Sequence, residues 1–311
     1  MSDNEKANPP VMSATLNKGR RDFITRGAAG AAGLALGASA LGGTLAASSF
    51  AAGDAAENKP TKRYQGKVVL ITGATSGIGE ATAHAYARQG ARVFFCGRRE
   101  ELGKQVQKDI REDGGEATYM RADVREQEQM SQFVQQCIET YGGLDIAFNN
   151  AGIEGPRGGL DEISVVGENG YQDVMRTNAD GVYFALRYEI PAMREKGGVI
   201  VNTGSMLSHR GSSFAGAYAA SKHAVIGFTR SAAAREAGNG IRVISVSPGG
   251  VDTELLKRFM GVDSLEGAGA DSPMGRIAQP SEVADVVLNL TAPEAIFLNG
   301  DDVKIDGASS A

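Results

Sequence analysis

The chain has 311 residues, including 42 glycines and no tryptophan, with 42% hydrophobic and 22% charged residues and a formal net charge of −5. This is the composition of a globular protein, and two cysteines with three scattered histidines exclude a disulfide scaffold and indicate no metal site. Because phosphate groups attract clustered lysine and arginine, the acidic balance argues against a nucleic-acid partner and leaves a small molecule as the expected one.

The first 51 residues have the layout of an export signal. A polar segment precedes Arg20 and Arg21, and residues 27–53 carry no charge. The run RRDFITR resembles the twin-arginine (Tat) signal, with cleavage expected after Ala51. The apolar segment is rich in Ala and Gly, which favours a cleaved signal over a permanent anchor or a disordered tail that matches by chance. We therefore expect export to the periplasm and no stable membrane insertion.

Residues 52–63 form a predicted linker, and residues 64–311 form a predicted single α/β domain. Helical segments, such as 79–89 and 126–141, alternate with short apolar runs, which predicts a doubly wound (Rossmann), mostly parallel seven-stranded sheet. The two cysteines, Cys96 and Cys137, are expected to fill the core. The predicted strands are 67–72, 91–96, 117–123, 144–149, 198–203, 241–247 and 302–306.

A glycine-rich turn follows the first predicted strand. The run TGATSGIG, residues 72–79, leads into a helix, and glycine there lets the backbone approach a pyrophosphate at the positive helix end. A merely structural tight turn is the alternative, but the position after the first strand favours a dinucleotide site. The residues of this turn expected to bind the cofactor are Gly73, Ser76, Gly77, Ile78 and Gly79.

The end of the second strand bears on the choice of cofactor. An NAD-binding site carries an acidic side chain there, whereas this chain has Gly97 followed by Arg98 and Arg99. Because a guanidinium group pairs with phosphate, NADP is favoured, and NAD stays possible. The alternative is that both arginines are ordinary loop charges.

Tyr218 and Lys222 lie four residues apart, on one face of a predicted helix. A free tyrosine has a pKa of about 10, so a nearby ammonium group and a positive nicotinamide ring would be needed to favour the phenolate as a base. Alone, such a pair is also typical of a packing or surface contact.

The runs TGATSGIG, NNAG (149–152) and YAASK (218–222) together resemble the short-chain dehydrogenase/reductase (SDR) family. The resemblance spans roughly residues 64–307, and the motifs stand in family order. It implies a dimer or tetramer and a catalytic tetrad of Asn178, Ser205, Tyr218 and Lys222. It also implies that Asp123 accepts a hydrogen bond from adenine and that Thr253 lies near the nicotinamide. The other implied cofactor contacts are Val124, Asn150, Ala151, Gly152, Pro248, Gly249 and Val251.

The expected function is hydride transfer between NADP(H) and a secondary alcohol or carbonyl compound. The alternatives are an NAD-dependent alcohol or sugar dehydrogenase and, from another class, a catalytically silent dinucleotide-binding sensor or scaffold. Met206, Leu207, residues 153–170 and a glycine-rich lid over residues 254–274 are expected to form the substrate pocket. His209 is either a substrate contact or an ordinary loop histidine.

Overall fold

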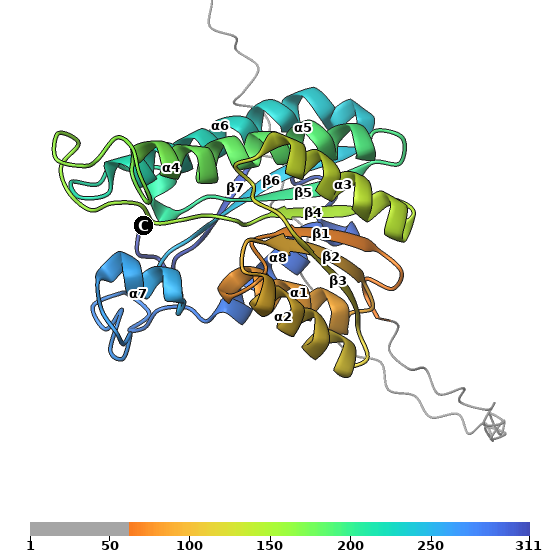
Figure 1. Ribbon diagram of the computed structural model, residues 1–311, viewed down its shortest axis with the longest axis horizontal. Coiled ribbons are helices and arrows are strands. Elements are labelled where there is room, and N and C mark those ends of the chain that lie inside the picture. The colour runs from red at the N-terminus through yellow and green to blue at the C-terminus, as the bar shows by residue number, and fades with distance from the viewer. Residues whose placement is uncertain (1–61) are drawn as a thin grey trace, which may run out of the picture. The chain divides into compact units, whose positions relative to one another are not determined.

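The computed structural model describes residues 62–311; the predicted signal, its cleavage site and nearly all of the predicted linker lie outside the described residues. Seven parallel strands form one sheet in the order β3-β2-β1-β4-β5-β6-β7 (Figure 1). The predicted Rossmann fold is therefore confirmed. The strands are β1 (Val68–Thr72), β2 (Arg92–Gly97), β3 (Glu116–Arg121), β4 (Ile146–Asn149), β5 (Gly198–Thr203), β6 (Ile241–Pro248) and β7 (Asp302–Ile305).

Every residue of β1 is buried, because helices cover both faces of the sheet. Leu70 of β1 lies beside Phe94 of β2 on one side and Ala147 of β4 on the other. A strand covered on both faces has a continuous apolar sequence rather than an alternating one, which is why the run VVLIT marks the centre of the sheet.

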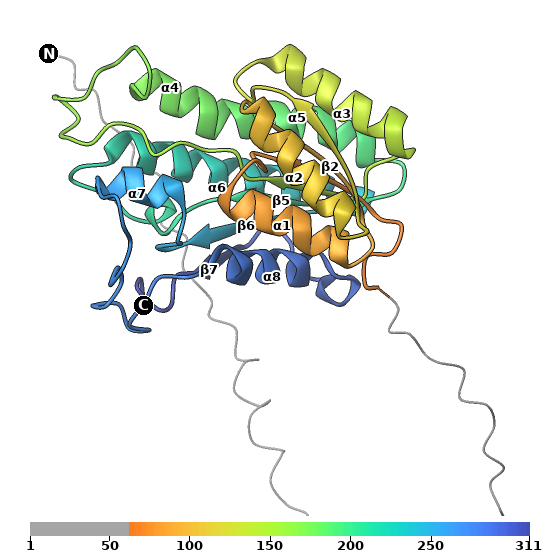
Figure 2. The ribbon, with the colours of Figure 1, turned by 60° about the horizontal axis from the view of Figure 1, so that its bottom comes forward.

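Two helical layers enclose two apolar cores (Figures 1 and 2). One layer contains α1 (Gly77–Arg88), α2 (Glu100–Glu112) and α8 (Pro280–Thr291). The other contains α3 (Gln127–Tyr141), α5 (Gly181–Met193) and α6 (Gly216–Glu236). Cys96 and Cys137 are free and buried in the core beneath the second layer, as predicted.

Helix α3 shows how the sequence sets the position of an element. Its buried residues recur at helical spacing, from Met130 through Phe133 and Cys137 to Tyr141. The helix ends at Gly142, which adopts the left-handed conformation with φ +82° while its amide donates to the Ile138 carbonyl. A side chain would be strained there, so glycine ends the helix and directs the chain into β4.

The carboxyl ends of the strands meet at one edge of the sheet, where two connecting segments gather (left in Figure 1). The first is the loop after β4, followed by α4 (Tyr171–Met175) and a π-helical turn, Arg176–Asp180, that leads into α5. The second is α7 (Glu254–Met260), the helical part of the predicted lid. Within residues 62–311 no helix combines the length and apolarity that crossing a bilayer requires.

Candidate active site

A cavity of about 710 Å³ opens at this carboxyl edge and brings nearly all predicted site residues together. Most of them follow the ends of β1 to β6, which is where a doubly wound sheet holds its ligand, and Tyr218 and Lys222 come from α6. The predicted residues that line it are Gly73, Ser76, Gly77, Ile78, Arg98, Arg99, Asp123, Val124, Asn150, Ala151, Gly152, Ser205, Tyr218, Lys222, Pro248, Gly249, Val251 and Thr253.

The glycine turn leaves no room for side chains. Gly73 has φ +69°, and a Cβ on it would lie 2.6 Å from the Cα of Ala151. Gly77 has φ +60°, and its Cβ would meet the Thr253 side chain at 3.1 Å. Gly79 lies behind the cavity wall, where a Cβ would approach the Gly73 carbonyl oxygen to 2.4 Å. The bare backbone at the start of α1 therefore fits a dinucleotide pyrophosphate.

The two arginines after β2 have different surroundings. Arg99 donates hydrogen bonds to the Thr75 and Ser76 hydroxyl oxygens, at 3.0 and 2.5 Å, so it ties the glycine turn to β2. Arg98 is exposed at the cavity and forms no ion pair within the described part of the chain. The Arg98 guanidinium group is therefore available to an anionic ligand, whereas one guanidinium nitrogen of Arg99 is already hydrogen-bonded to two hydroxyl groups of the protein.

Asp123 faces the cavity with its carboxylate held by Arg125, whose Nε lies 3.0 Å from both carboxylate oxygens. Burial alone would raise the pKa of Asp123, but the hydrogen bonds and charge of Arg125 outweigh it and lower the pKa. Arg125 also pairs with Asp173, which fixes its position. The carboxylate is therefore ionised and oriented as a hydrogen-bond acceptor.

Tyr218 and Lys222 both lie on α6, one turn apart. The Lys222 Nζ lies 5.7 Å from the centre of the Tyr218 ring and donates to the Thr203 carbonyl oxygen at 2.7 Å. Lys222 is 3% exposed, and this burial lowers its pKa to about 8. The predicted pair therefore shares one face of the helix and one cavity.

The pKa of Tyr218 is raised in the protein chain itself. Burial is the largest cause, the nearby Glu154 carboxylate adds to it, and a hydrogen bond with Ser205 opposes it. The Lys222 ammonium group alone does not lower the pKa of Tyr218 below its usual value. The sequence predicts that Lys222 and a positive nicotinamide ring together stabilise the Tyr218 phenolate. The charge of a bound nicotinamide would therefore have to supply part of this stabilisation.

Ser205 begins a short turn after β5, and its Oγ accepts a hydrogen bond from the Leu207 amide at 3.1 Å. The turn is closed by Ser208, whose hydroxyl accepts from the Ser205 amide at 2.9 Å. Neither bond uses the Ser205 hydroxyl proton, which can be donated to the Tyr218 oxygen or to an oxygen bound beside it.

Asn178 lies in the π-helical turn, fully buried behind the cavity wall. Its side-chain amide both accepts from the Ile153 amide at 2.8 Å and donates to the Ile153 carbonyl at 2.9 Å. A Cβ on Gly152 would lie 3.3 Å from the Asn178 Oδ1 and 3.6 Å from the Lys222 Nζ. The side chain of Asn178 therefore fixes the chain after NNAG beside Lys222 rather than facing the cavity.

Met206, Leu207 and parts of the predicted segments 153–170 and 254–274 line the cavity, whereas the contacts among these segments and the contribution of Phe214 were not predicted. Glu154 and Arg258 form a two-pronged ion pair across the cavity mouth, and Phe214 and Phe259 line the same end. His209 lines neither this cavity nor the one described next; its Nε2 lies 2.7 Å from the Asp302 carboxylate. The position of His209 agrees with the loop interpretation.

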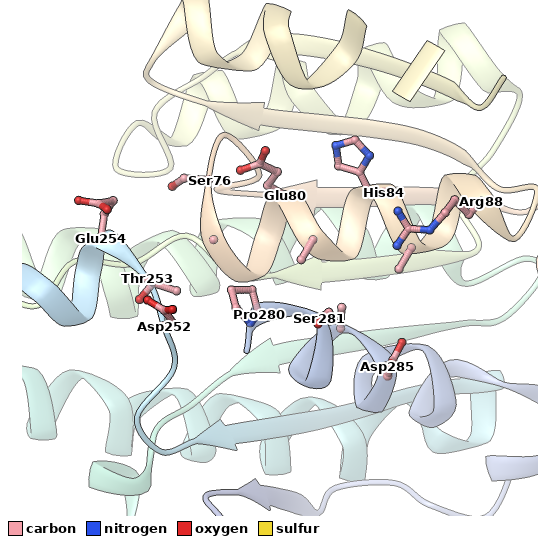
Figure 3. A pocket seen from close by; sticks show the side chains of 14 residues that line it. Ser76, Glu80, His84, Arg88, Asp252, Thr253, Glu254, Pro280, Ser281 and Asp285 are labelled. Atoms are coloured by element: carbon pink, nitrogen blue, oxygen red, sulfur yellow. The ribbon is translucent and has the colours of Figure 1, made fainter. Parts of the chain in front are cut away.

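A second cavity, of about 540 Å³, runs between α1 and α8 (Figure 3). Glu80, His84 and Arg88 project into it from α1, and Asp285 projects from α8. It contains none of the four tetrad residues, and the described residues hold no cluster of His, Cys, Asp and Glu able to bind a metal ion. The chemistry of the site therefore belongs to the first cavity.

Comparison with known proteins identifies the class. The family profile described as "Enoyl-(Acyl carrier protein) reductase" matches residues 73–309. The chain is 38% identical to a cyclohexanol dehydrogenase of Acinetobacter sp. (strain SE19) over 249 residues, covering 80% of this chain and 96% of that protein. It is also 38% identical over 250 residues to a 2,5-dichloro-2,5-cyclohexadiene-1,4-diol dehydrogenase of Sphingobium indicum, covering 79% of this chain and 98% of the relative.

Among solved structures, a 3-ketoacyl-(acyl-carrier-protein) reductase from Brucella melitensis, complexed with NADH, superposes with a TM-score of 0.73 at 31% identity, covering 80% of this chain and all of that one. The chain belongs to the short-chain dehydrogenase/reductase family. Its activity is that of an NAD(P)-dependent oxidoreductase of alcohol and carbonyl groups.

Proposed function

We propose that the protein is an NADP(H)-dependent dehydrogenase or reductase that interconverts a cyclic secondary alcohol and its ketone. The observation that carries the proposal is the convergence of Tyr218, Lys222 and Ser205 on one cavity whose opposite end holds Arg98 and no acidic side chain at Gly97. The first three residues supply the proton chemistry, and the last two bear on the cofactor.

In this mechanism a bound nicotinamide supplies or accepts the hydride. Tyr218 gives the proton to the carbonyl oxygen during reduction and takes it from the hydroxyl during oxidation. Ser205 donates a hydrogen bond to the same oxygen while negative charge develops there. Lys222 favours the phenolate by its charge and holds a ribose hydroxyl. The side chain of Asn178 is committed to Ile153, and its part in the proposed proton relay is to hold a water near Lys222.

The preference for NADP rests on Arg98. Its exposed, unpaired guanidinium group at the cavity suits a ribose 2'-phosphate, and a carboxylate that would repel this phosphate is missing at Gly97. Binding of NAD is the alternative, and the relative from Brucella melitensis that holds NADH supports it. Direct titration of both cofactors distinguishes them.

The proposed substrate class rests on the cavity wall and on the relatives. Met206, Leu207, Phe214 and Phe259 make the substrate end largely apolar. Two relatives are named for oxidation of a six-membered ring alcohol or diol. A compact, uncharged ring fits such a wall, because apolar surface is removed from water on binding.

A spectrophotometric assay tests this proposal. Purified protein is supplied with NADP or NAD and with cyclohexanol, a cyclic diol, an open-chain secondary alcohol and a sugar, and nicotinamide absorbance is followed. Turnover of ring alcohols with NADP supports the proposal. Faster turnover of sugars with NAD supports the first alternative, and cofactor binding without turnover of any alcohol or ketone supports the sensor or scaffold.

We also propose that the protein is exported through the Tat route and is a homo-oligomer. The run RRDFITR supports export. An exposed aromatic side chain supports association: Tyr183 of α5 is 47% exposed, and its ring centre lies 5.9 Å from that of the partly buried Phe228 of α6. Light scattering coupled to size exclusion measures the oligomeric state, and a monomer at micromolar concentration would contradict this part of the proposal.

A further inference from the structure

The substrate end of the cavity is closed by an ion pair between two distant parts of the chain. Glu154, in the loop after β4, accepts from the Arg258 Nε at 2.6 Å and from its second guanidinium nitrogen at 3.1 Å. The Glu154 side chain is 8% exposed, whereas that of Arg258 on α7 is 54% exposed. A buried carboxylate is stable only with such a partner, so this pair binds α7 to the loop.

The end of α7 is held by the same loop. Arg157 donates to the Phe259 and Met260 carbonyl oxygens, both at 3.0 Å, which satisfies the last turn of the helix. The Arg157 guanidinium also lies 5.0 Å from the centre of the Phe214 ring.

An aromatic row continues these contacts to the reacting group. The Phe259 ring lies 5.9 Å from that of Phe214 and 5.9 Å from that of Tyr218. Helix α7 therefore contacts the ring that carries the catalytic hydroxyl, and a shift of α7 would open the wall beside Tyr218.

The ion pair also sets the charge at this end of the cavity. The charged groups that face Tyr218 are Lys222 on its own helix, Glu154 from the loop and, through Glu154, Arg258 from α7. Arg210 lines the cavity as well, with its guanidinium on the Met206 sulfur. The Glu154 charge still acts beside Tyr218, whose pKa it raises, because its partner Arg258 is half-exposed to solvent. An uncharged substrate is unaffected by this charge, whereas a substrate carboxylate placed beside Tyr218 is repelled by it.

We propose that Glu154 and Arg258 form a specificity-determining latch, which holds α7 over the substrate end of the cavity and restricts it to uncharged substrates. This inference rests on the proposed function, because it concerns the substrate of the same site. Glu154 and Arg258 act here as positioning residues for the wall around Tyr218.

Hydrogen–deuterium exchange of the full chain tests the latch without relying on activity. Glu154→Gln and Arg258→Met are compared with Lys257→Met, which removes an ion pair with Glu254 within the same helix. Exchange across residues 254–262 should accelerate about tenfold or more in the first two variants, the factor for losing a hydrogen bond to a charged group, and change little in the third. Equal exchange in all three variants and the parent would overturn the latch.

Two kinetic readouts test the specificity. Glu154→Gln leaves Arg258 unpaired, so a cyclohexanone carrying a ring carboxylate should gain at least about tenfold in kcat/KM relative to cyclohexanone, whereas Arg258→Met should shift this ratio the opposite way. The rate of alcohol oxidation should rise with pH as Tyr218 loses its proton. The midpoint of this rise should move to lower pH in Glu154→Gln and to higher pH in Arg258→Met, because the charges left behind have opposite signs.

The specificity role would be overturned if the pH dependence of oxidation shifted in the same direction in both variants. It would also be overturned if the kcat/KM ratio of the two ketones did not change. A parent that reduces no ketone would overturn the proposed function instead, while the exchange rates of α7 still decide the latch.

Discussion

The ammonium group of Lys222 donates a hydrogen bond to the carbonyl oxygen of Thr203, 2.7 Å away. Thr203 ends β5 two residues before Ser205, so this bond ties the helix that carries Tyr218 to the strand end that carries the catalytic serine. A displacement of either element moves the proton donor relative to the group that orients the carbonyl. Lys222 therefore contributes to the geometry of the site as well as to its charge.

Replacement of Tyr218 by Phe removes the hydroxyl and keeps the ring against Phe259. Turnover should fall by about 10² or more, the range for losing general acid/base catalysis, while cofactor affinity stays nearly unchanged. Lys222→Ala should lower both, since it removes the contact to Thr203 as well. Steady-state kinetics and cofactor titration measure these effects, and near-normal turnover of Tyr218→Phe would end the proposed mechanism.

Glu189 predicts a pH dependence of stability. It is fully buried on α5, accepts from the Asn149 side chain at 2.9 Å, and its burial raises the pKa to about 7. Because the unfolded carboxyl titrates near 4.3, the folded state binds more protons in between, so this contribution to stability is complete below about pH 4 and is lost as pH rises through 7.

Glu189→Gln should remove that dependence. Above pH 7 the variant should gain up to a few kcal/mol relative to the parent, at about 1.4 kcal/mol per unit of pKa shift, and the gain should vanish at pH 4. Urea unfolding of both proteins at several pH values measures it. A difference between the two proteins that does not vary with pH would show that Glu189 does not titrate in this range.

The two arginines after β2 should respond differently to substitution. Arg98→Ala should weaken the binding of NADP by about 1.5–3 kcal/mol, the range for a hydrogen bond to a charged group, and leave the binding of NAD nearly unchanged. Arg99→Ala should weaken both cofactors, because Arg99 holds the Thr75 and Ser76 hydroxyls of the glycine turn. Added salt should weaken NADP more than NAD in the parent. Titrations that show a parent preference for NAD, or equal losses in Arg98→Ala, would refute the phosphate contact.

Converting the site to NAD requires two substitutions. A Cβ on Gly97 would lie 2.5 Å from the Thr75 methyl group, so Gly97→Asp alone forces the glycine turn to move. Combined with Thr75→Ala, the aspartate gains space, repels a 2'-phosphate and offers an acceptor to the ribose hydroxyls. The double variant should prefer NAD in the same titrations, and the single variant should also lose stability.

Replacement of Arg20 and Arg21 by Lys tests the export proposal. The Tat route moves folded proteins, so a precursor could leave the cytoplasm with its cofactor bound. The substituted precursor should accumulate in the cytoplasm with its leader intact, which immunoblots of cell fractions detect. The unsubstituted protein behaving the same way would contradict export.

The sequence predicted the seven strands to within two residues at each end. The inner strands are covered on both faces and are largely apolar, whereas the edge strands β3 and β7 are only partly buried and carry polar residues. The residues of the cavity were predicted for a related reason. Most of them follow a strand, and parallel strands bring their carboxyl ends to one edge. Tyr218 and Lys222 lie on α6 instead and were predicted from their four-residue spacing and the YAASK run.

Contacts between distant segments were not predictable in this way. Glu154 and Arg258 are 104 residues apart, and His209 and Asp302 are 93 apart. No periodicity links such pairs, since their proximity depends on how loops cross the finished sheet. The different surroundings of Arg98 and Arg99 likewise depend on where the glycine turn lies, although the two residues are neighbours in sequence.

The burial of both thiols bears on the proposed export to an oxidising compartment. Burial raises the pKa of Cys96 and of Cys137 to about 12, and only the thiolate reacts readily with disulfides and alkylating reagents. A folded molecule therefore offers no reactive sulfur for mixed disulfides among its described residues, whereas an unfolded one offers two. These thiols would consequently be alkylated only when the domain unfolds, so the rate of alkylation reports the rate of global unfolding.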